Sequence, residues 1–464
     1  MKNVFTTAIL TFTFLLSAAG HGQTVKEVLS FSDALSSSGG AVTLAQGRDG
    51  RLYGTTDGFS STTNPDGTIF RVNPDGSAAT TLFSLSGTNG QEPAFGLTLA
   101  IDGNYYGTTV AGGVASSGVL FKVSPTGTYT VLYQFTGGSD GALPVGPPIQ
   151  ASDGNFYGAT NHGTVYKYVP STATFSTILT LSSDGSQGVG IDSPLIQASN
   201  GSLYGTAVIG GTSNCGTLFR LSTTGVLIHV YSFPCKLGGK YPQAPLYEAS
   251  DGNLYGTTVQ GGTAGHGCGT VGCGTIFRVS QGVVSVIYRF SGYPNDGALP
   301  ASGLVQGTDG NLYGSTEQGG VSKFGTLYQI TTSGQYKLLY SFADAIGIFP
   351  GASLMQHTNG KFYGTASAGG TNSYGSIYSL DMGLGPFISL VHYTGSVGHS
   401  VQILGQGLLG STAVTVNGLA ATSFKVVSDY YMTAVVPTGA TTGPVVVTTP
   451  TGTLTSNQNF RIVQ

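Results

Sequence analysis

Four cysteines lie close together in the sequence, all between residues 215 and 273. Cys215 precedes the run GTLF and Cys235 follows the run IHVYSF, so a hairpin of these two runs would bring both sulfurs to its open end. Cys268 and Cys273 would then close a small loop, although four cysteines allow three pairings. A zinc site using His266 is the weaker alternative, because the spacing matches no common zinc pattern. We expect disulfides here.

Two strings resemble functional motifs but lack the surrounding elements that such motifs need. Residues 137–141 read GGSDG, the pattern of a nucleophile elbow, yet no helical pattern follows them. Residues 405–410 read GQGLLG, a dinucleotide-binding pattern, yet they lie among predicted strands. The histidines do not recur with the internal repeat described below. We therefore predict no catalytic residue, no metal ligand and no cofactor from these motifs.

Carboxylates are few, and most Asp residues stand in Asp-Gly turns, where they hydrogen-bond nearby backbone. Glu92, Glu248, Glu317 and His162 depart from the repeated pattern and are the first positions to inspect for a hydrolytic site. A glycosidase needs two carboxylates about 5 to 10 Å apart, and the fold could bring turn carboxylates together. The sequence leaves such a site open, and also leaves open a calcium ion held by the Asp-Gly loops.

Composition excludes several classes of protein. Charged residues make up 8% of the 464 residues and the net charge is -3, against about 25% charged residues in ordinary soluble proteins. No basic face is available for nucleic acid. The 25 Tyr, 23 Phe and 40% hydrophobic residues argue against disorder. The 75 glycines follow no collagen period, so we expect them in turns.

A repeat of about 52 residues organises most of the chain. The segment DGNLYGTT at 251–258 recurs in seven copies, and each copy is followed by a run such as GTIF and usually by a run such as SVIYRF. The repeated tyrosines are Tyr53, Tyr106, Tyr157, Tyr204, Tyr255, Tyr313 and Tyr363. With the stretch before each Asp-Gly, every copy contains four short β-branched or aromatic runs bounded by turn residues, which is the pattern of four strands.

Seven units of four strands predict an all-β protein with a seven-bladed β-propeller. Residues 25–32 match the fourth-strand pattern, whereas the seventh unit lacks its own fourth strand. The N-terminal strand can therefore complete the last sheet and close the ring, which removes exposed sheet edges. The alternative is an open array of small sheets.

The repeated residues are interpreted first as scaffold. Asp-Gly and Asn-Gly favour tight turns with positive φ. Each tyrosine ring can pack between neighbouring sheets with its hydroxyl reaching a partner, and the glycine after it allows another backbone to approach closely. A ring of seven tyrosines or aspartates facing a ligand is the functional alternative.

The two ends of the chain have different patterns. Lys2, the apolar stretch at 4–16 and the small residues at 17–20 predict a secretory signal over residues 1–23. The repeat region is expected over 24–384, and residues 385–464 alternate apolar and polar residues in six to seven short runs, which predicts an immunoglobulin-like β-sandwich. We expect no membrane-spanning segment in the mature chain.

The repeats resemble the GloVer tandem repeats of secreted, choice-of-anchor bacterial proteins, over residues 25–384. Residues 396–463, with SVGHSVQILGQGL and VVVTTPTGTLTSNQNFRIV, are similar to an IPT/TIG domain. The resemblance implies export and carries no known reaction. The leading hypothesis is a secreted or cell-surface binding or adhesion protein for polysaccharide or a surface protein. The alternatives are an extracellular polysaccharide hydrolase or lyase and a structural envelope or matrix protein.

Overall fold

The computed structural model describes residues 23–32, 42–58, 63–93 and 95–463. The predicted secretory signal lies outside these residues, apart from residue 23. Every regular element of the described residues is a strand, except for two short 3-10 turns, η2 (Gly87–Asn89) and η3 (Lys236–Gly238). The all-β prediction is therefore confirmed. Among the described residues, no helix is long and apolar enough to cross a membrane.

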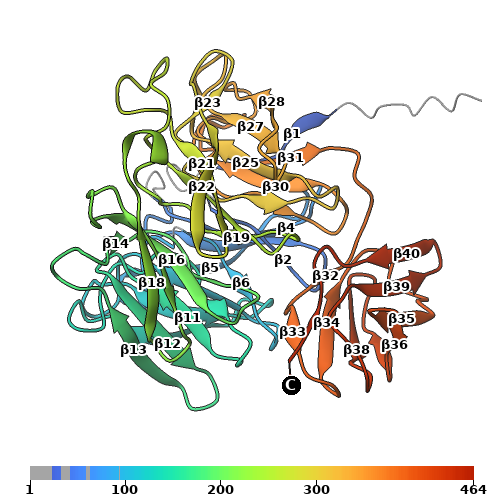
Figure 1. Cartoon of the computed structure of the whole chain (residues 1–464). Helices are drawn as coiled ribbons and strands as arrows, with labels where there is room; N and C mark the ends of the chain where they lie inside the picture. The colour runs from blue at the N-terminus through green and yellow to red at the C-terminus, as the bar shows by residue number, and fades with distance from the viewer. Residues whose placement is uncertain (1–22, 33–41, 59–62, 94, 464) are drawn as a thin grey trace, which may run out of the picture.

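Each repeat forms its own antiparallel sheet, in which the strands pair in chain order (Figure 1). The first strands are β2 (Ala45–Gln46), β6 (Thr98–Leu99), β10 (Ile149–Gln150), β15 (Ile196–Gln197), β19 (Tyr247–Glu248), β24 (Val305–Gln306) and β29 (Met355–Gln356). The second strands are β3 (Leu52–Thr56), β7 (Tyr105–Thr109), β11 (Phe156–Ala159), β16 (Leu203–Ile209), β20 (Leu254–Thr258), β25 (Leu312–Thr316) and β30 (Phe362–Ala366).

The two remaining strands of each sheet follow the same order. The third strands are β4 (Thr68–Val72), β8 (Val119–Val123), β12 (Thr164–Val169), β17 (Thr217–Leu221), β21 (Thr275–Ser280), β27 (Thr326–Ile330) and β31 (Ser376–Asp381). The fourth strands are β5 (Thr80–Ser84), β9 (Tyr129–Gln134), β13 (Thr174–Thr180), β18 (Leu227–Ser232), β22 (Val283–Arg289), β28 (Tyr336–Ser341) and, for the last sheet, β1 (Thr24–Ser30). Two short additions are β14 (Val189–Ile191), which pairs with β16, and the pair β23 (Gly297–Ala298) and β26 (Gln318–Gly319).

The N-terminal strand β1 pairs with β31, from Thr24 opposite Asp381 to Ser30 opposite Ser376. The expected completion of the last sheet from both ends of the repeat region is thus present. Clusters of buried apolar side chains join each repeat sheet to the next one along the chain, and a further cluster joins the last sheet to the first. In that closing cluster, Tyr363 and Ile377 pack with Leu52 and Phe70.

Each repeated tyrosine hydrogen-bonds to the turn four residues before it. The hydroxyl donates to the turn aspartate in five sheets, as from Tyr255 to Asp251 over 2.7 Å. In the other two sheets the turn holds an asparagine, and its amide donates to the hydroxyl, as from Asn200 to Tyr204 over 2.8 Å. The tyrosine rings lie between sheets, and Tyr53 stacks on Tyr105 of the next sheet with ring centroids 4.1 Å apart.

The glycine that follows each tyrosine faces an aromatic ring of the neighbouring strand. A Cβ built on Gly256 would lie 2.5 Å from Cζ of Phe277 and 2.7 Å from Cδ2 of Leu246. The expectation that another backbone approaches this glycine is wrong. The space is taken by the aromatic side chain of the GTIF-type run, because Gly256 pairs directly with Phe277 across the sheet.

Both expected disulfides are present, Cys215–Cys235 and Cys268–Cys273. The first bridges the open end of the hairpin of β17 and β18, in which Thr217 pairs with Ser232. The second closes the loop between β20 and β21, and its two cysteines pack in the cluster that joins the fifth and sixth sheets.

The C-terminal residues form two four-stranded sheets around one apolar core, which includes Ile403, Val416 and Met432. One sheet contains β32 (Ser389–Leu390), β34 (Ser400–Leu404), β38 (Tyr431–Val435) and β37 (Phe424–Val426); the other contains β36 (Leu419–Ala420), β35 (Ala413–Val416), β39 (Val445–Thr449) and β40 (Gly452–Thr455). A parallel pair, β33 (Thr394–Gly395) and β41 (Arg461–Ile462), lies beside them. This is more strands than expected, because several are only two residues long.

Candidate functional site

A glutamine at the end of the first strand links neighbouring repeat sheets. Its side-chain oxygen accepts a hydrogen bond from a backbone N–H in the turn of the preceding sheet, as Gln197 does from Ser152 over 2.8 Å. In most copies its amide also donates to a carbonyl of its own turn, as Gln197 does to Gly201. The glutamines that make such links are Gln46, Gln150, Gln197, Gln306 and Gln356.

Gln46 links the first sheet to the last one, because its side-chain oxygen accepts a hydrogen bond from Thr358 N–H over 2.9 Å. Two sheets lack the glutamine. The second sheet has Leu99 and the fifth has Glu248 at the equivalent position. Both carboxylate oxygens of Glu248 accept from Ser199 N–H, at 2.9 and 2.8 Å, so the link to the preceding sheet is kept.

The C-terminal sheets are docked on this same rim of the repeat region. Near Leu99, the side chains of Arg48 and Gln402 make the polar contacts. Each donates a hydrogen bond to Ile101 O over 2.7 Å, and Arg48 also donates to the side-chain oxygen of Gln402 over 2.7 Å. The Arg48 guanidinium lies 4.6 Å from the ring centroid of Tyr431. The C-terminal residues are therefore held on the repeat sheets by hydrogen bonds.

Further contacts fix this docking at other sheets. Nε2 of His392 lies 3.1 Å from the carbonyl oxygen of Ala151, which is hydrogen-bonding distance. The amide of Gln458 donates to the Tyr247 hydroxyl over 3.0 Å, and the amide of Gln406 donates to Thr358. Several sheets thus contact the C-terminal residues, while a space remains between them.

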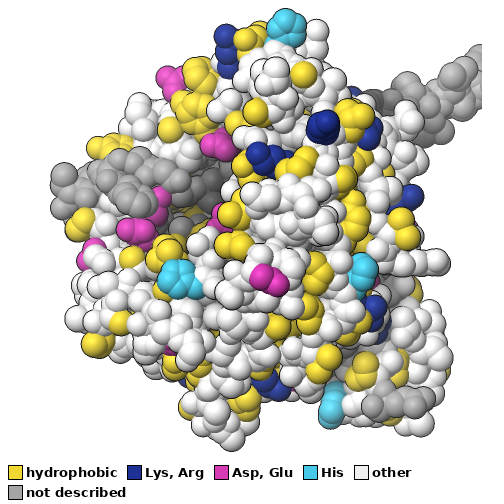
Figure 2. Space-filling model, turned by 60° about the vertical axis from the view of Figure 1, so that its left-hand side comes forward, with side chains coloured by type: hydrophobic (Ala, Val, Ile, Leu, Met, Phe, Trp, Pro, Cys, Tyr) yellow, Lys and Arg dark blue, Asp and Glu magenta, His cyan; other side chains and the backbone are white. Residues whose placement is uncertain are grey.

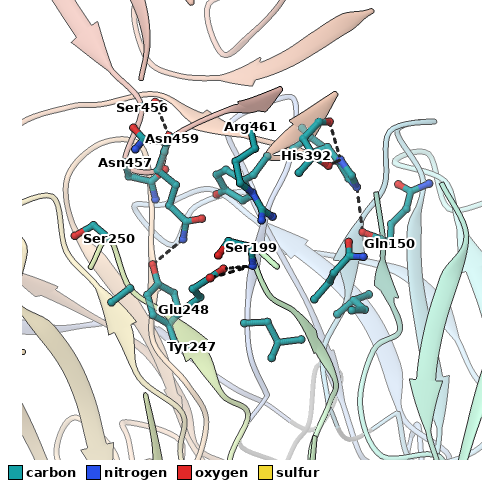
Figure 3. Close-up of a pocket in the computed structure, with 18 of the residues that line it drawn as sticks. Gln150, Ser199, Tyr247, Glu248, Ser250, His392, Ser456, Asn457, Asn459 and Arg461 are labelled. Carbon is teal, nitrogen blue, oxygen red and sulfur yellow. Dashed lines mark hydrogen bonds between the residues drawn. The ribbon is translucent and has the colours of Figure 1, made fainter. Parts of the chain in front are cut away.

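That space is a cavity of about 550 Å³ (Figure 3). Its repeat side is formed by the first strands and turns of the second to fifth sheets, and its other side by C-terminal residues 391–394, 442, 456–459 and 461. Amides and hydroxyls line it together with apolar side chains such as Leu99, Ile149 and Ile196. Among the residues that line it, Glu248 is the only carboxylate and Arg461 the only guanidinium. Its volume lies in the range of small-molecule sites, about 300 to 1,000 Å³.

Glu248 and Arg461 approach the cavity from opposite sides. Figure 3 shows Arg461 extending from the C-terminal strands toward Ser199 and Glu248. Burial lowers the pKa of Arg461, and the negative charge of Glu248 opposes that change. Burial raises the pKa of the Tyr247 hydroxyl to about 12, so this group is neutral at physiological pH. The cavity therefore presents one anion, one cation and many neutral donors and acceptors.

The four positions singled out from the sequence are not brought together. Glu248 lines the cavity, whereas Glu92, Glu317 and His162 do not. Glu317 follows β25, where burial raises its pKa. The disulfides and the seven repeated tyrosines also lie outside the cavity lining. Within the described residues, no group of three or more His, Cys, Asp or Glu side chains could hold a metal ion.

Reasoning from the sequence missed Arg461, His392 and the glutamine links. The glutamines were visible, because the runs AQGRDG, IQASDG and VQGTDG place Gln before each turn. Arg461 and His392 carried no signal, because they belong to the part of the chain without repeats.

Comparison with known proteins places the chain in a family. The model of the Gloeobacter/Verrucomicrobia repeat matches residues 12–163, 139–271 and 266–411. None of the curated proteins matches the chain. Among solved structures, the extracellular domain of a protein described as a hybrid two component system from B. thetaiotaomicron aligns with a TM-score of 0.51 and 13% identity, over 95% of this chain and 55% of that one.

PorZ, a surface component of the type-IX secretion system of Porphyromonas gingivalis, aligns with a TM-score of 0.46 and 15% identity, over 89% of this chain and 58% of PorZ. At these identities only the fold is compared, and the many small antiparallel sheets are β-propeller-like. The repeat matches cover most of the chain, and the resemblance of the repeats is thereby confirmed. The chain belongs to the Gloeobacter/Verrucomicrobia repeat family.

Proposed function

We propose that this is an exported, non-enzymatic binding or adhesion protein that holds a carbohydrate between a seven-bladed propeller and an immunoglobulin-like domain. The propeller spans residues 24–384 and the second domain, of the IPT/TIG kind, spans residues 385–464. The observation that carries the proposal is the cavity of about 550 Å³, whose amides and hydroxyls come from both domains. Such groups match the hydroxyls of a sugar, which both donate and accept hydrogen bonds.

Seven blades in a closed ring are supported by two independent series of contacts. Apolar clusters join each sheet to the next, including the last to the first, and the glutamine links run in the same order. An immunoglobulin-like domain is supported by two four-stranded sheets that share one core. The scaffold interpretation of the tyrosines is supported by their hydrogen bonds to the turns.

Binding is favoured over hydrolysis because a single carboxylate lines the cavity. Hydrolysis by the common route needs two carboxylates on opposite sides of the bond, and Glu248 is already bonded to Ser199 N–H. Figure 2 shows few charged side chains on a largely neutral face, which suits a neutral polar ligand or a protein partner better than nucleic acid.

Two disulfides support export, because disulfides persist in oxidising compartments. Mass spectrometry of the secreted protein tests this: we expect a mature N-terminus near residue 24 and a mass gain of about 4 Da on reduction. A cytoplasmic protein with four free thiols would contradict export.

Incubation of the purified protein with bacterial, plant and fungal polysaccharides tests binding against hydrolysis. We expect retention of at least one polysaccharide without release of reducing or unsaturated ends. Release of such ends would identify an enzyme. No retention of any polysaccharide would contradict carbohydrate binding and favour a protein partner instead, which cross-linking on intact cells detects.

A further inference from the structure

Arg461 has no hydrogen bond and no ion pair within 4.0 Å from its guanidinium to any described residue. Its backbone is nevertheless fixed, because its N–H donates to Tyr393 O over 2.8 Å in the strand pair of β33 and β41. Several other arginines donate to protein acceptors, namely Arg48, Arg51, Arg71, Arg220 and Arg289. A half-buried guanidinium with free donors therefore faces the cavity. Arg278, outside the cavity lining, also has a buried Nε without a hydrogen-bond partner, so it is the place of Arg461 beside Glu248 that carries the argument.

The opposite wall of the cavity offers acceptors that most sheets with a glutamine lack. In four of the five sheets with a glutamine, the amide donates to the turn carbonyl, as Gln306 does to Gly310 over 2.8 Å. Glu248 has no amide, and no described donor reaches the carbonyl of Gly252, a residue that lines the cavity. The replacement of glutamine by glutamate thus leaves a carboxylate and a carbonyl for ligand hydroxyls.

We infer that the cavity binds a sugar that carries a carboxylate, a uronic acid unit of an acidic polysaccharide, with the carboxylate on Arg461 and the hydroxyls on Glu248 and Gly252 O. This inference rests on the proposed function and names its ligand class. The planar guanidinium fork matches a carboxylate in a bidentate geometry. The remaining hydroxyls of the sugar face the amides of residues such as Gln197, Asn457 and Asn459.

Other anions fit less well. A phosphate monoester carries up to two negative charges, and Glu248 would repel it from a cavity with only one guanidinium. An amino acid could place its ammonium on Glu248 and its carboxylate on Arg461. The lining outside this pair, however, carries many neutral amides and hydroxyls from both sides of the cavity, which would serve the hydroxyls of a sugar and would be left largely without partners by a small amino acid.

Isothermal titration calorimetry with the full mature chain tests the inference. The probes are uronic acid oligosaccharides prepared from pectin, alginate and glucuronoxylan, each paired with its methyl-esterified form, and free amino acids and dipeptides. We expect at least one uronate to bind about 10- to 100-fold more tightly than its ester, because a charge-assisted bidentate contact is lost.

Two variants locate the effect. Arg461→Gln should abolish the preference for acid over ester, and Arg461→Lys, which keeps the charge but not the fork, should have an intermediate preference. The matched control is Arg220→Gln, since Arg220 bonds Ser202 away from the cavity and should leave the preference unchanged. Circular dichroism and thermal unfolding check that each variant is folded.

The possible results separate the two proposals. Equal binding of acid and ester, or an acid preference that persists in Arg461→Gln, overturns the uronate inference but leaves carbohydrate binding standing. Binding of an amino acid or dipeptide in place of every sugar overturns both. Binding of no probe, together with no polysaccharide retained, overturns the proposed function itself.

Discussion

The neighbourhoods of Leu99 and Glu248 both lack the glutamine that links the other repeat sheets, yet they restore the link differently. At Leu99, the missing polar group is replaced by Arg48, from the turn of the preceding repeat sheet, and by Gln402 of the C-terminal sheets. At Glu248, the link to Ser199 is kept and only the donor to the turn carbonyl is lost. The first departure from the repeat therefore helps to dock the C-terminal sheets, and the second leaves free acceptors in a cavity.

The packing inside the repeat sheets is common to both neighbourhoods, and a substitution that disturbs it should have the largest effect on stability. Gly256→Ala places a Cβ against Phe277 and Leu246 inside the fifth sheet. We expect the free energy of unfolding to fall by about 3 kcal/mol or more, since overpacking a rigid core costs about 1 to 3 kcal/mol and two groups must move. Urea unfolding followed by tyrosine fluorescence measures it.

The matched control is Gly282→Ala in the same sheet, where φ is +83° and a Cβ would meet nothing within 4 Å. That variant should lose only about 1 kcal/mol, the cost of a left-handed conformation for alanine. Equal losses of unfolding free energy in the two variants would show that the ring of Phe277 is not the reason for glycine at position 256.

Docking at Leu99 should depend strongly on Arg48. Arg48→Ala removes hydrogen bonds to Ile101 O and Gln402 and the contact with Tyr431. We expect the domain contact to weaken by about 2 kcal/mol, because hydrogen bonds from charged groups contribute about 1.5 to 3 kcal/mol. Hydrogen exchange should then rise at the amide of Phe387, which donates to Thr358 O of the last repeat sheet.

Arg71→Ala is the control for Arg48→Ala, because Arg71 bonds Pro125 O between the first two sheets without touching the C-terminal domain. It should leave hydrogen exchange at residue 387 unchanged. Unchanged exchange in Arg48→Ala as well would mean that the other contacts alone hold the domain.

This docking marks the limit of what the sequence could predict. The repeats, the turn-bonded tyrosines and the Cys215–Cys235 pair follow from local patterns, because each involves residues in adjacent strands or turns. Glu248 could be noticed as a departure from the repeat. The partners of Arg48 and the position of Arg461 could not be predicted, because Arg48 and Gln402 are 354 residues apart and meet only through the placement of the C-terminal sheets on the repeat sheets.

The turns provide a smaller, pH-dependent contrast between sheets with Asp and sheets with Asn. Burial tends to raise the pKa of Asp251, but hydrogen bonds from Tyr255 and Asn253 outweigh it and lower the pKa overall. Its stabilising contribution is therefore present above the unfolded value of about 3.9 and is lost as pH falls through the lower folded value. Burial and the charge of Asp251 raise the pKa of Tyr255 to about 12, so its contribution is lost as pH rises from about 10 through about 12.

Asp251→Asn should reduce stability by less than about 1 kcal/mol at neutral pH, because the site is largely exposed and the amide can donate to Tyr255 as Asn200 does to Tyr204. The difference from the parent protein should shrink below about pH 4, where the unfolded parent chain begins to protonate Asp251, and disappear as pH falls through the lower folded pKa. The reciprocal Asn200→Asp should introduce the same acid dependence in the fourth sheet. If the free energy of unfolding changed with pH in the same way for the parent and both variants from pH 3 to 7, the expected difference between Asp turns and Asn turns would be contradicted.

Glu248→Gln should give the smallest change in stability, and it tests directly whether the glutamate at this position leaves acceptors free for a ligand. A glutamine can keep the bond to Ser199 N–H and donate to Gly252 O, as Gln306 does to Gly310. We therefore expect a gain of about 0.5 to 1 kcal/mol in the free energy of unfolding, with weaker uronate binding, since the amide occupies the carbonyl and the carboxylate is gone. Gln306→Glu, outside the cavity lining, should lose stability without changing binding. If Glu248→Gln left both quantities unchanged, glutamate at this position would be a neutral replacement, and the fifth sheet would be no different from its neighbours.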